Sequence, residues 1–142
     1  MSDRCDLCTL ETETSYHLFY LCPVSQRFWA ETKQYLDKFN LFLPVTRLQI
    51  LFGIITQTCD SVLNTFILLG KHLIWTCKHS KKIPNLYHFK NSLAVHLNNL
   101  KLCYVIKSLG HIFDDQWGNI LLDLVTQPVQ DGSALLHDPQ QQ

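Results

Sequence analysis

Four residues with metal-binding side chains lie within the first 22 positions and are the strongest constraint on the fold of this chain. They follow one another in the order C-x2-C-x8-H-x4-C, at Cys5, Cys8, His17 and Cys22. A C-x-x-C pair fits a tight turn with both thiolates on one side, and a second pair four or five residues apart fits one helical turn. Closing both pairs on a single Zn²⁺ gives a tetrahedral site with no open position for a substrate. The spacing therefore predicts a structural zinc knuckle.

The cysteines also allow other interpretations. The chain has 6 cysteines, and a secreted chain of this size often uses such a set as a disulfide framework. The first residues contain no apolar core of a signal peptide, so an oxidising compartment is not supported. A redox C-x-x-C and incidental cysteines are further alternatives, but no buried strand precedes Cys5. Zinc is favoured, and the expected location is intracellular and reducing, in the cytoplasm or nucleus.

Charge is organised by region, although 12 Lys and Arg balance 12 Asp and Glu overall. Residues 61–113 contain seven lysines and no acidic residue, whereas residues 1–60 and 114–142 carry net negative charge. Such a basic block suits phosphate or another acidic surface. Equally, the lysines can serve only to keep an apolar helical hairpin in solution. No membrane span is expected, because the apolar stretch at 62–75 is too short for a bilayer helix.

Hydrophobic periodicity predicts helix for most of the chain after the knuckle. Proline is tolerated at a first helical position, so one helix is expected to begin at Pro23 and to run to about Phe39. Its aromatic residues Phe28 and Trp29 are expected to pack against the knuckle. The short apolar piece at 47–53 is either helix or strand, since periodicity alone does not decide.

Three further helices are predicted downstream. Asp60 or Ser61 can cap a buried helix that follows. A long helix is expected over residues 84–109, with Pro84 first and Gly110 ending it. A shorter helix carries Trp117.

Together these elements predict a mainly α fold. It consists of a small CCHC zinc knuckle, a bundle of about four helices and a disordered C-terminal tail. The expected organisation is a zinc-binding module with its following helix at 1–40, a helical body at 41–125 and the tail at 126–142.

Short motifs flank the four ligands and continue beyond them. In chain order they are Cys5-Asp6-Leu7-Cys8, Glu11-Thr12, His17-Leu18-Phe19, Cys22-Pro23, Phe28-Trp29, Leu51-Phe52-Gly53, Ile83-Pro84 and Phe113 with Trp117. This order resembles the zinc-binding region near the C-terminus of LINE-type (non-LTR) retrotransposon reverse transcriptases and the helical region after it. The resemblance implies an element that binds template RNA or target DNA and helps to position the polymerase.

The parts of such polyproteins that carry out catalysis are missing from this chain. A reverse transcriptase holds two metal ions with paired aspartates in a Y-x-D-D hairpin, and the sequence contains no such motif. Asp114-Asp115 is the one adjacent acidic pair and is interpreted as a helix cap or a solvated turn. The apurinic-type endonuclease is missing too. The chain therefore looks like a remnant or excised end of a retroelement protein and is not expected to be an enzyme.

Two functions from different classes follow. The first is a zinc-stabilised region that binds RNA or DNA, single-stranded or structured. Its phosphate contacts are expected from Arg4, Arg27, Lys71, Lys78, Lys81 and Lys82. The alternative is a structural or protein-interaction helical module that docks on a reverse-transcriptase body.

The remaining chemically versatile side chains are expected to be structural. The five histidines between residues 72 and 111 are predicted to lie on the surface. Cys59, Cys77 and Cys103 are predicted to be small buried residues. The three tryptophans can stack on bases, but core packing is the favoured interpretation for Trp29, Trp75 and Trp117.

Overall fold

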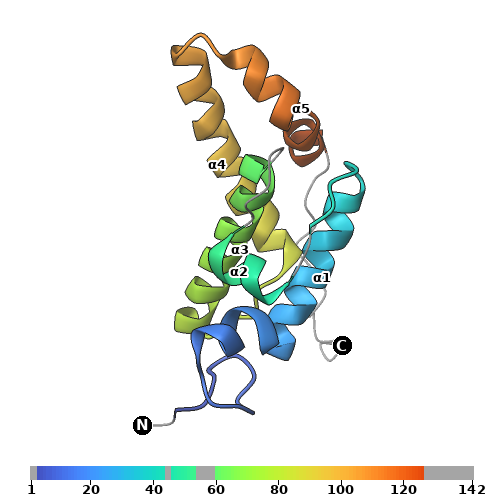
Figure 1. Ribbon diagram of the computed structural model, residues 1–142. Helices are drawn as coiled ribbons and strands as arrows, with labels where there is room; N and C mark the ends of the chain where they lie inside the picture. Colours follow the sequence, from blue (N-terminus) through green and yellow to red (C-terminus); the bar gives the residue numbers. More distant parts are fainter. Residues whose placement is uncertain (1–2, 44–45, 54–59, 127–142) are drawn as a thin grey trace, which may run out of the picture.

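The computed structural model describes residues 3–43, 46–53 and 60–126, and these residues are mainly helical (Figure 1). The elements in chain order are the π-helix η1 (His17–Leu21) and the α-helices α1 (Pro23–Asp37), α2 (Arg47–Phe52), α3 (Asp60–Ser80), α4 (Leu86–Ile106) and α5 (Gly110–Thr126). In the described ranges the only β pairing is an isolated bridge between Arg4 and Thr12. The predicted mainly α fold is confirmed, and the short apolar piece is helix. The tail was predicted over residues 126–142: Thr126 is the last residue of α5, and residues 127–142 lie outside the described residues.

The N-terminal segment that carries the four candidate metal ligands (residues 3–22, the metal-binding end) and the α4–α5 hairpin lie at opposite ends of the molecule (Figure 1). The N-terminal loop and η1 lie below α1 and α3, and α2 sits in front of α3. The upper half of α4 extends beyond α3 and leads into α5, which folds back toward the C-terminal end of α1. No described helix has both the length and the apolar character needed to cross a membrane.

A path of aromatic rings links four helices through the core. Phe28 of α1 meets Phe89 of α4 edge-on, with 5.7 Å between ring centroids. Phe66 of α3 lies 5.5 Å from Phe89 and stacks at 6.0 Å on Trp117 of α5. All four side chains are buried. The same buried cluster includes Cys5 and Cys22, so the core is continuous from the metal-binding end to α5.

Gly70 marks the closest approach between α1 and α3. A Cβ atom at this position would lie 2.5 and 2.7 Å from two carbons of the Trp29 ring. Such distances are far inside van der Waals contact, so only glycine allows the ring to lie on the α3 backbone. This contact explains a glycine in the interior of α3, where it costs roughly 1 kcal/mol relative to alanine.

The structure confirms one predicted helix start and corrects two other boundaries. α1 begins at Pro23 as expected. α4 begins at Leu86 and not at Pro84, because the Asn85 side chain accepts a hydrogen bond from the His88 N–H at 2.9 Å and so caps the helix. Gly110 does not end α4 but is the first residue of α5.

Ser108, and not Gly110, lies in the turn that ends α4. Its φ is 58°, and its N–H donates to the Val105 carbonyl at 3.0 Å. The Leu109 N–H donates to the Tyr104 carbonyl at 2.8 Å, which completes a Schellman-type ending. The Asp114-Asp115 pair lies inside α5, exposed to solvent, and so is neither the predicted cap nor the predicted turn.

Two side chains predicted to be buried are exposed. Trp75 is 47% exposed and packs edge-on against His79 with 4.4 Å between centroids. Cys103, near the C-terminal end of α4, is also exposed. The predictions for Trp29, Trp117 and Cys77 are confirmed. Cys59 lies outside the described residues. The five histidines are exposed or half-buried, as expected.

Candidate metal centre

A tight loop carries the first two candidate ligands, Cys5 and Cys8. Thr9 has a left-handed φ of 60°, and its N–H donates to the Cys5 carbonyl at 2.8 Å. Across the loop, the Cys5 N–H donates to the Glu11 carbonyl at 2.8 Å. The Arg4–Thr12 bridge closes the base of the loop. These backbone bonds direct both thiol groups to the same side.

The other two candidate ligands lie at the ends of one π-helical turn: His17 is the first residue of η1, and Cys22 directly follows its last residue. The Cys22 N–H donates to the His17 carbonyl at 2.7 Å, an i to i+5 bond that closes one wide turn. The residue before a proline avoids the helical region, and Cys22 accordingly has φ −56° and ψ 126°. Pro23 therefore fixes the end of η1, the position of Cys22 and the start of α1 together.

The four ligand atoms form one compact group. All of them lie within 4.8 Å of one another. The Sγ atoms of Cys5 and Cys22 are 3.9 Å apart, and Cys8 Sγ is 3.3 Å from His17 Nε2. A tetrahedral site with metal–sulfur bonds of about 2.3 Å and metal–nitrogen bonds of about 2.0 Å places its ligand atoms about 3.5–3.8 Å apart. The three cysteines and the histidine can thus all reach a single metal ion.

Burial and hydrogen bonding act differently on the thiols. Burial opposes ionisation of Cys8, but backbone hydrogen bonds from Leu10 and Glu11 and the contact with His17 lower its pKa to about 7. For Cys22, burial prevails over the backbone hydrogen bonds and raises the pKa to about 11. Metal binding requires thiolates and releases their protons, so affinity of this group for a metal rises with pH. The described cysteines are all free thiols, with no disulfide among them.

Two side-chain contacts tie the metal-binding end to the helices. The Glu13 carboxylate accepts a hydrogen bond from the Asp6 N–H at 3.2 Å and forms an ion pair with Lys78 of α3. Burial alone would raise the pKa of Glu13, but the hydrogen bond from Lys78 lowers it. Trp29 Nε1 donates to the Phe19 carbonyl at 2.7 Å, which joins η1 to α1. Of the two α1 aromatics predicted to pack against the N-terminal module, Trp29 thus makes the contact through Phe19, whereas the Phe28 ring meets Phe89 of α4.

Two of the predicted phosphate-binding residues lie beside the metal-binding loop. Lys81 and Lys82 follow the end of α3 and are exposed. They line a hollow of about 320 Å³ together with the loop residues Asp6, Leu7 and Thr9, and with Ile83. The left-handed φ of Lys81, 55°, turns the chain at this point. The fold brings this basic pair to the loop across some 70 residues of sequence.

The other four predicted residues have different surroundings. Lys71 is half-buried: its Nζ donates to the Leu51 carbonyl at 3.2 Å, and burial lowers its pKa. Lys78 forms an ion pair with Glu13. Arg27 is exposed on α1, 3.6 Å from the Glu31 carboxylate, and Arg4 is exposed at the base of the metal-binding loop. The six residues therefore do not form one cluster.

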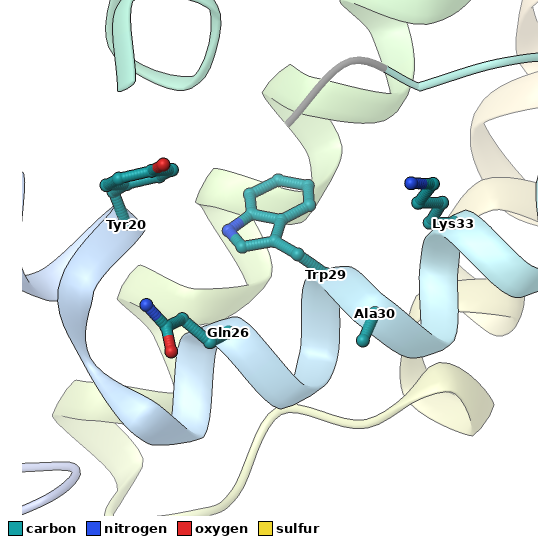
Figure 2. Close-up of a pocket in the computed structure, with 5 residues that line it drawn as sticks. All are labelled: Tyr20, Gln26, Trp29, Ala30 and Lys33. Carbon is teal, nitrogen blue, oxygen red and sulfur yellow. The ribbon is translucent and has the colours of Figure 1, made fainter. Parts of the chain in front are cut away.

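A second pocket, which was not predicted from the sequence, lies between η1 and α1. Its lining residues are Tyr20, Gln26, Trp29, Ala30 and Lys33, and its volume is about 260 Å³ (Figure 2). The lining residues from α1 recur at helical spacing along one side of the helix. This spacing alone does not predict a pocket, because any solvated helix face shows it too.

The described residues contain one group of three or more metal-binding side chains, the Cys5, Cys8, His17 and Cys22 cluster. Two of its members come from a tight loop and two from a single π-helical turn. Buried contacts with α1 and α3 hold this arrangement in place. No protein-family model, curated protein or solved structure matches the chain.

Proposed function

We propose that the Cys5, Cys8, His17 and Cys22 cluster binds one structural Zn²⁺. Three thiolates and one imidazole are a donor set that Zn²⁺ favours, and four protein ligands leave no position open for a substrate. The loop buries little apolar surface of its own, so a bound metal would supply folding free energy that the loop lacks. The distances among the four ligand atoms support this proposal.

For the chain as a whole, the proposed function is non-catalytic binding of nucleic acid, as in the C-terminal region of a non-LTR retrotransposon reverse transcriptase. The observation that carries it is the position of Lys81 and Lys82 on the hollow beside the metal-binding loop. Exposed ammonium groups contact phosphates without reading sequence. The expected partner is RNA or DNA, single-stranded or structured.

Binding to nucleic acid can be tested with the purified full-length chain. RNA, single-stranded DNA and duplex DNA are titrated at several salt concentrations. The logarithm of the affinity should fall with the logarithm of salt concentration by about 0.7 per phosphate contact for single strands. The Lys81→Gln/Lys82→Gln variant should bind more weakly and with a shallower slope. Lys101→Gln, at the other end of the molecule, is the matched control; absence of binding, or equal loss in both variants, contradicts the proposal.

The metal is tested separately by its effect on local folding. Protein purified without chelator should contain about one zinc per chain, and Cys8→Ser or His17→Ala should lose it. Amide hydrogen exchange should then accelerate across residues 5–22, while α4 and α5 keep their protection. Cys103→Ser removes an exposed cysteine that is not a ligand and should change neither measurement. Unchanged protection of residues 5–22 after metal removal would rule out a structural role.

A second candidate function, docking on a reverse-transcriptase body, is favoured by the outer face of α4. Aliphatic side chains on this face are exposed by 54–74%, at Val95, Leu102, Val105 and Ile106. Their spacing places them on one side of the helix. Under this function the isolated chain self-associates through α4, and Leu102→Gln/Ile106→Gln makes it monomeric in light scattering. Lysine-to-glutamate substitutions at Lys81 and Lys82 would then leave nucleic-acid binding unchanged.

A further inference from the structure

The pocket between η1 and α1 combines an aromatic ring, an amide and an ammonium group (Figure 2). Tyr20 comes from η1, whereas Gln26, Trp29, Ala30 and Lys33 come from α1. The Trp29 ring stands between Tyr20 and Lys33, and the Gln26 amide lies on the Tyr20 side (Figure 2). No carboxylate lines the pocket, so an anionic ligand meets no like charge there.

The aromatic part of the pocket is held in place before any ligand binds. The Tyr20 ring stacks on Tyr16 with 5.5 Å between centroids and 14° between planes. The Arg47 guanidinium covers Tyr16 at 4.3 Å. The Trp29 indole is fixed by its hydrogen bond to Phe19 and is only 2% exposed. A prearranged wall of this kind lowers the entropy cost of binding a flat ring.

The polar groups lie where the edge and the phosphate of a nucleotide can reach them. The Gln26 amide offers both a donor and an acceptor, which suits the hydrogen-bonding edge of a base. Gln26 and Lys33 are seven residues apart, so they share one side of α1 about 10 Å apart along its axis. Lys33 is exposed, and its Nζ lies 5.1 Å from the centroid of the Phe42 ring.

We propose that this pocket binds one unstacked base of a single-stranded nucleic acid. The base lies against Tyr20, its edge meets the Gln26 amide, and the adjoining phosphate contacts Lys33. Bases of single strands are commonly bound on aromatic side chains in this way, whereas a base within a duplex must first leave the stack. This inference rests on the proposed nucleic-acid-binding function. It adds a base-binding site that is separate from the phosphate contacts of Lys81 and Lys82.

The test uses the zinc-loaded full-length chain and short single strands in which 2-aminopurine replaces one base. Binding should change the emission of 2-aminopurine, because the base stacks on Tyr20. Tyr20→Ala should weaken binding by roughly 5- to 100-fold, as measured for other base–aromatic stacks, while Tyr20→Phe keeps the wild-type affinity. Lys33→Gln should weaken binding and reduce the salt slope by about one phosphate contact.

The variants separate this inference from the proposed function. If the wild-type chain binds single strands and Tyr20→Ala and Lys33→Gln bind equally well, the pocket is not a base site but the proposed function stands. If the wild-type chain binds no strand, both fail. Equal affinity for duplex and single strand with unchanged 2-aminopurine emission also overturns the base site. Zinc content and melting temperature show whether Tyr20→Ala folds; if it does not, Gln26→Ala and Lys33→Gln, both at exposed positions, decide.

Discussion

Gly70 shows how much of the packing depends on a single missing methyl group. Replacing it with alanine would improve helix propensity by about 1 kcal/mol, but the new Cβ would meet the Trp29 ring at 2.5 Å. Overpacking of this kind costs about 1–3 kcal/mol. We therefore expect Gly70→Ala to lower the free energy of unfolding in urea denaturation.

Gly118 of α5 is the matched control for this substitution. A Cβ there would find its nearest neighbour at 3.9 Å, an ordinary contact. Gly118→Ala should therefore stabilise the chain by up to about 1 kcal/mol. If both substitutions shift stability in the same direction, the close contact between Trp29 and α3 does not exist in solution.

Tyr35 gives the stability of the chain a dependence on alkaline pH. Its side chain is buried, and its hydroxyl donates to Asp123 of α5 at 3.0 Å. Burial first, and then the Asp123 carboxylate, raise the pKa of this phenol. The unfolded chain loses the proton near pH 10, as free tyrosine does, whereas the folded chain still holds it. The contribution to stability is therefore complete below about pH 10 and falls as pH rises toward the folded-state pKa.

The Tyr35→Phe variant tests this dependence. It removes one hydrogen bond, so we expect a loss of roughly 0.5–1.5 kcal/mol at pH 7. Urea denaturation between pH 9 and 11 should show a decline in wild-type stability that is shallower in the variant. Parallel curves for the two proteins would show that Tyr35 ionises normally in the folded state.

At the scale of single elements, the N-terminus of α4 depends on Asn85. Its side chain accepts the His88 N–H, one of the unpaired donors of the first turn. Asn85→Ala should lower the free energy of unfolding by about 0.5–2 kcal/mol. Asn91→Ala changes an exposed asparagine inside the same helix and should be within about 0.5 kcal/mol of the wild type. Equal effects in thermal melts would contradict the cap.

The helix boundaries show why sequence rules succeed at some positions and fail at others. Pro23 correctly predicts the start of α1. The Cys22 side chain before it makes no capping hydrogen bond, and Pro23 is the first helical residue. At Pro84 the same rule competes with the capping residue that follows, and Asn85 prevails. Gly110 was predicted to end α4, but the left-handed residue after the helix is Ser108.

At the scale of the whole molecule, the ion pair between Glu13 and Lys78 joins the metal-binding end to α3. The side chains are only 21% and 12% exposed, so solvent screens the pair weakly. We expect a double-mutant cycle with Glu13→Gln and Lys78→Met to give a coupling of roughly 0.5–3 kcal/mol. Additive effects of the two substitutions in chemical denaturation would exclude the interaction.

The site was predictable where its chemistry is local and not where it depends on distant residues. Cys5, Cys8, His17 and Cys22 are close in sequence, and two short turns suffice to gather them. The sequence shows how many lysines there are, but it does not predict which groups surround each of them. Lys78 pairs with the Glu13 carboxylate, 65 residues away in sequence. Lys71 is half-buried, with its Nζ over the Phe19 ring, whereas Lys81 and Lys82 are exposed.

Because Cys22 lies directly before Pro23, a metal bound at the proposed site would be thermodynamically coupled to α1. Tyr20 precedes Cys22 by two residues and Gln26 follows it by four, so a ligand held by both side chains also restrains the backbone between them. By linkage, the factor by which the metal increases affinity for such a ligand equals the factor by which the ligand increases affinity for the metal. A bound strand would then slow the transfer of metal to a competing chelator, and the metal would act as an effector of binding as well as a support for the fold.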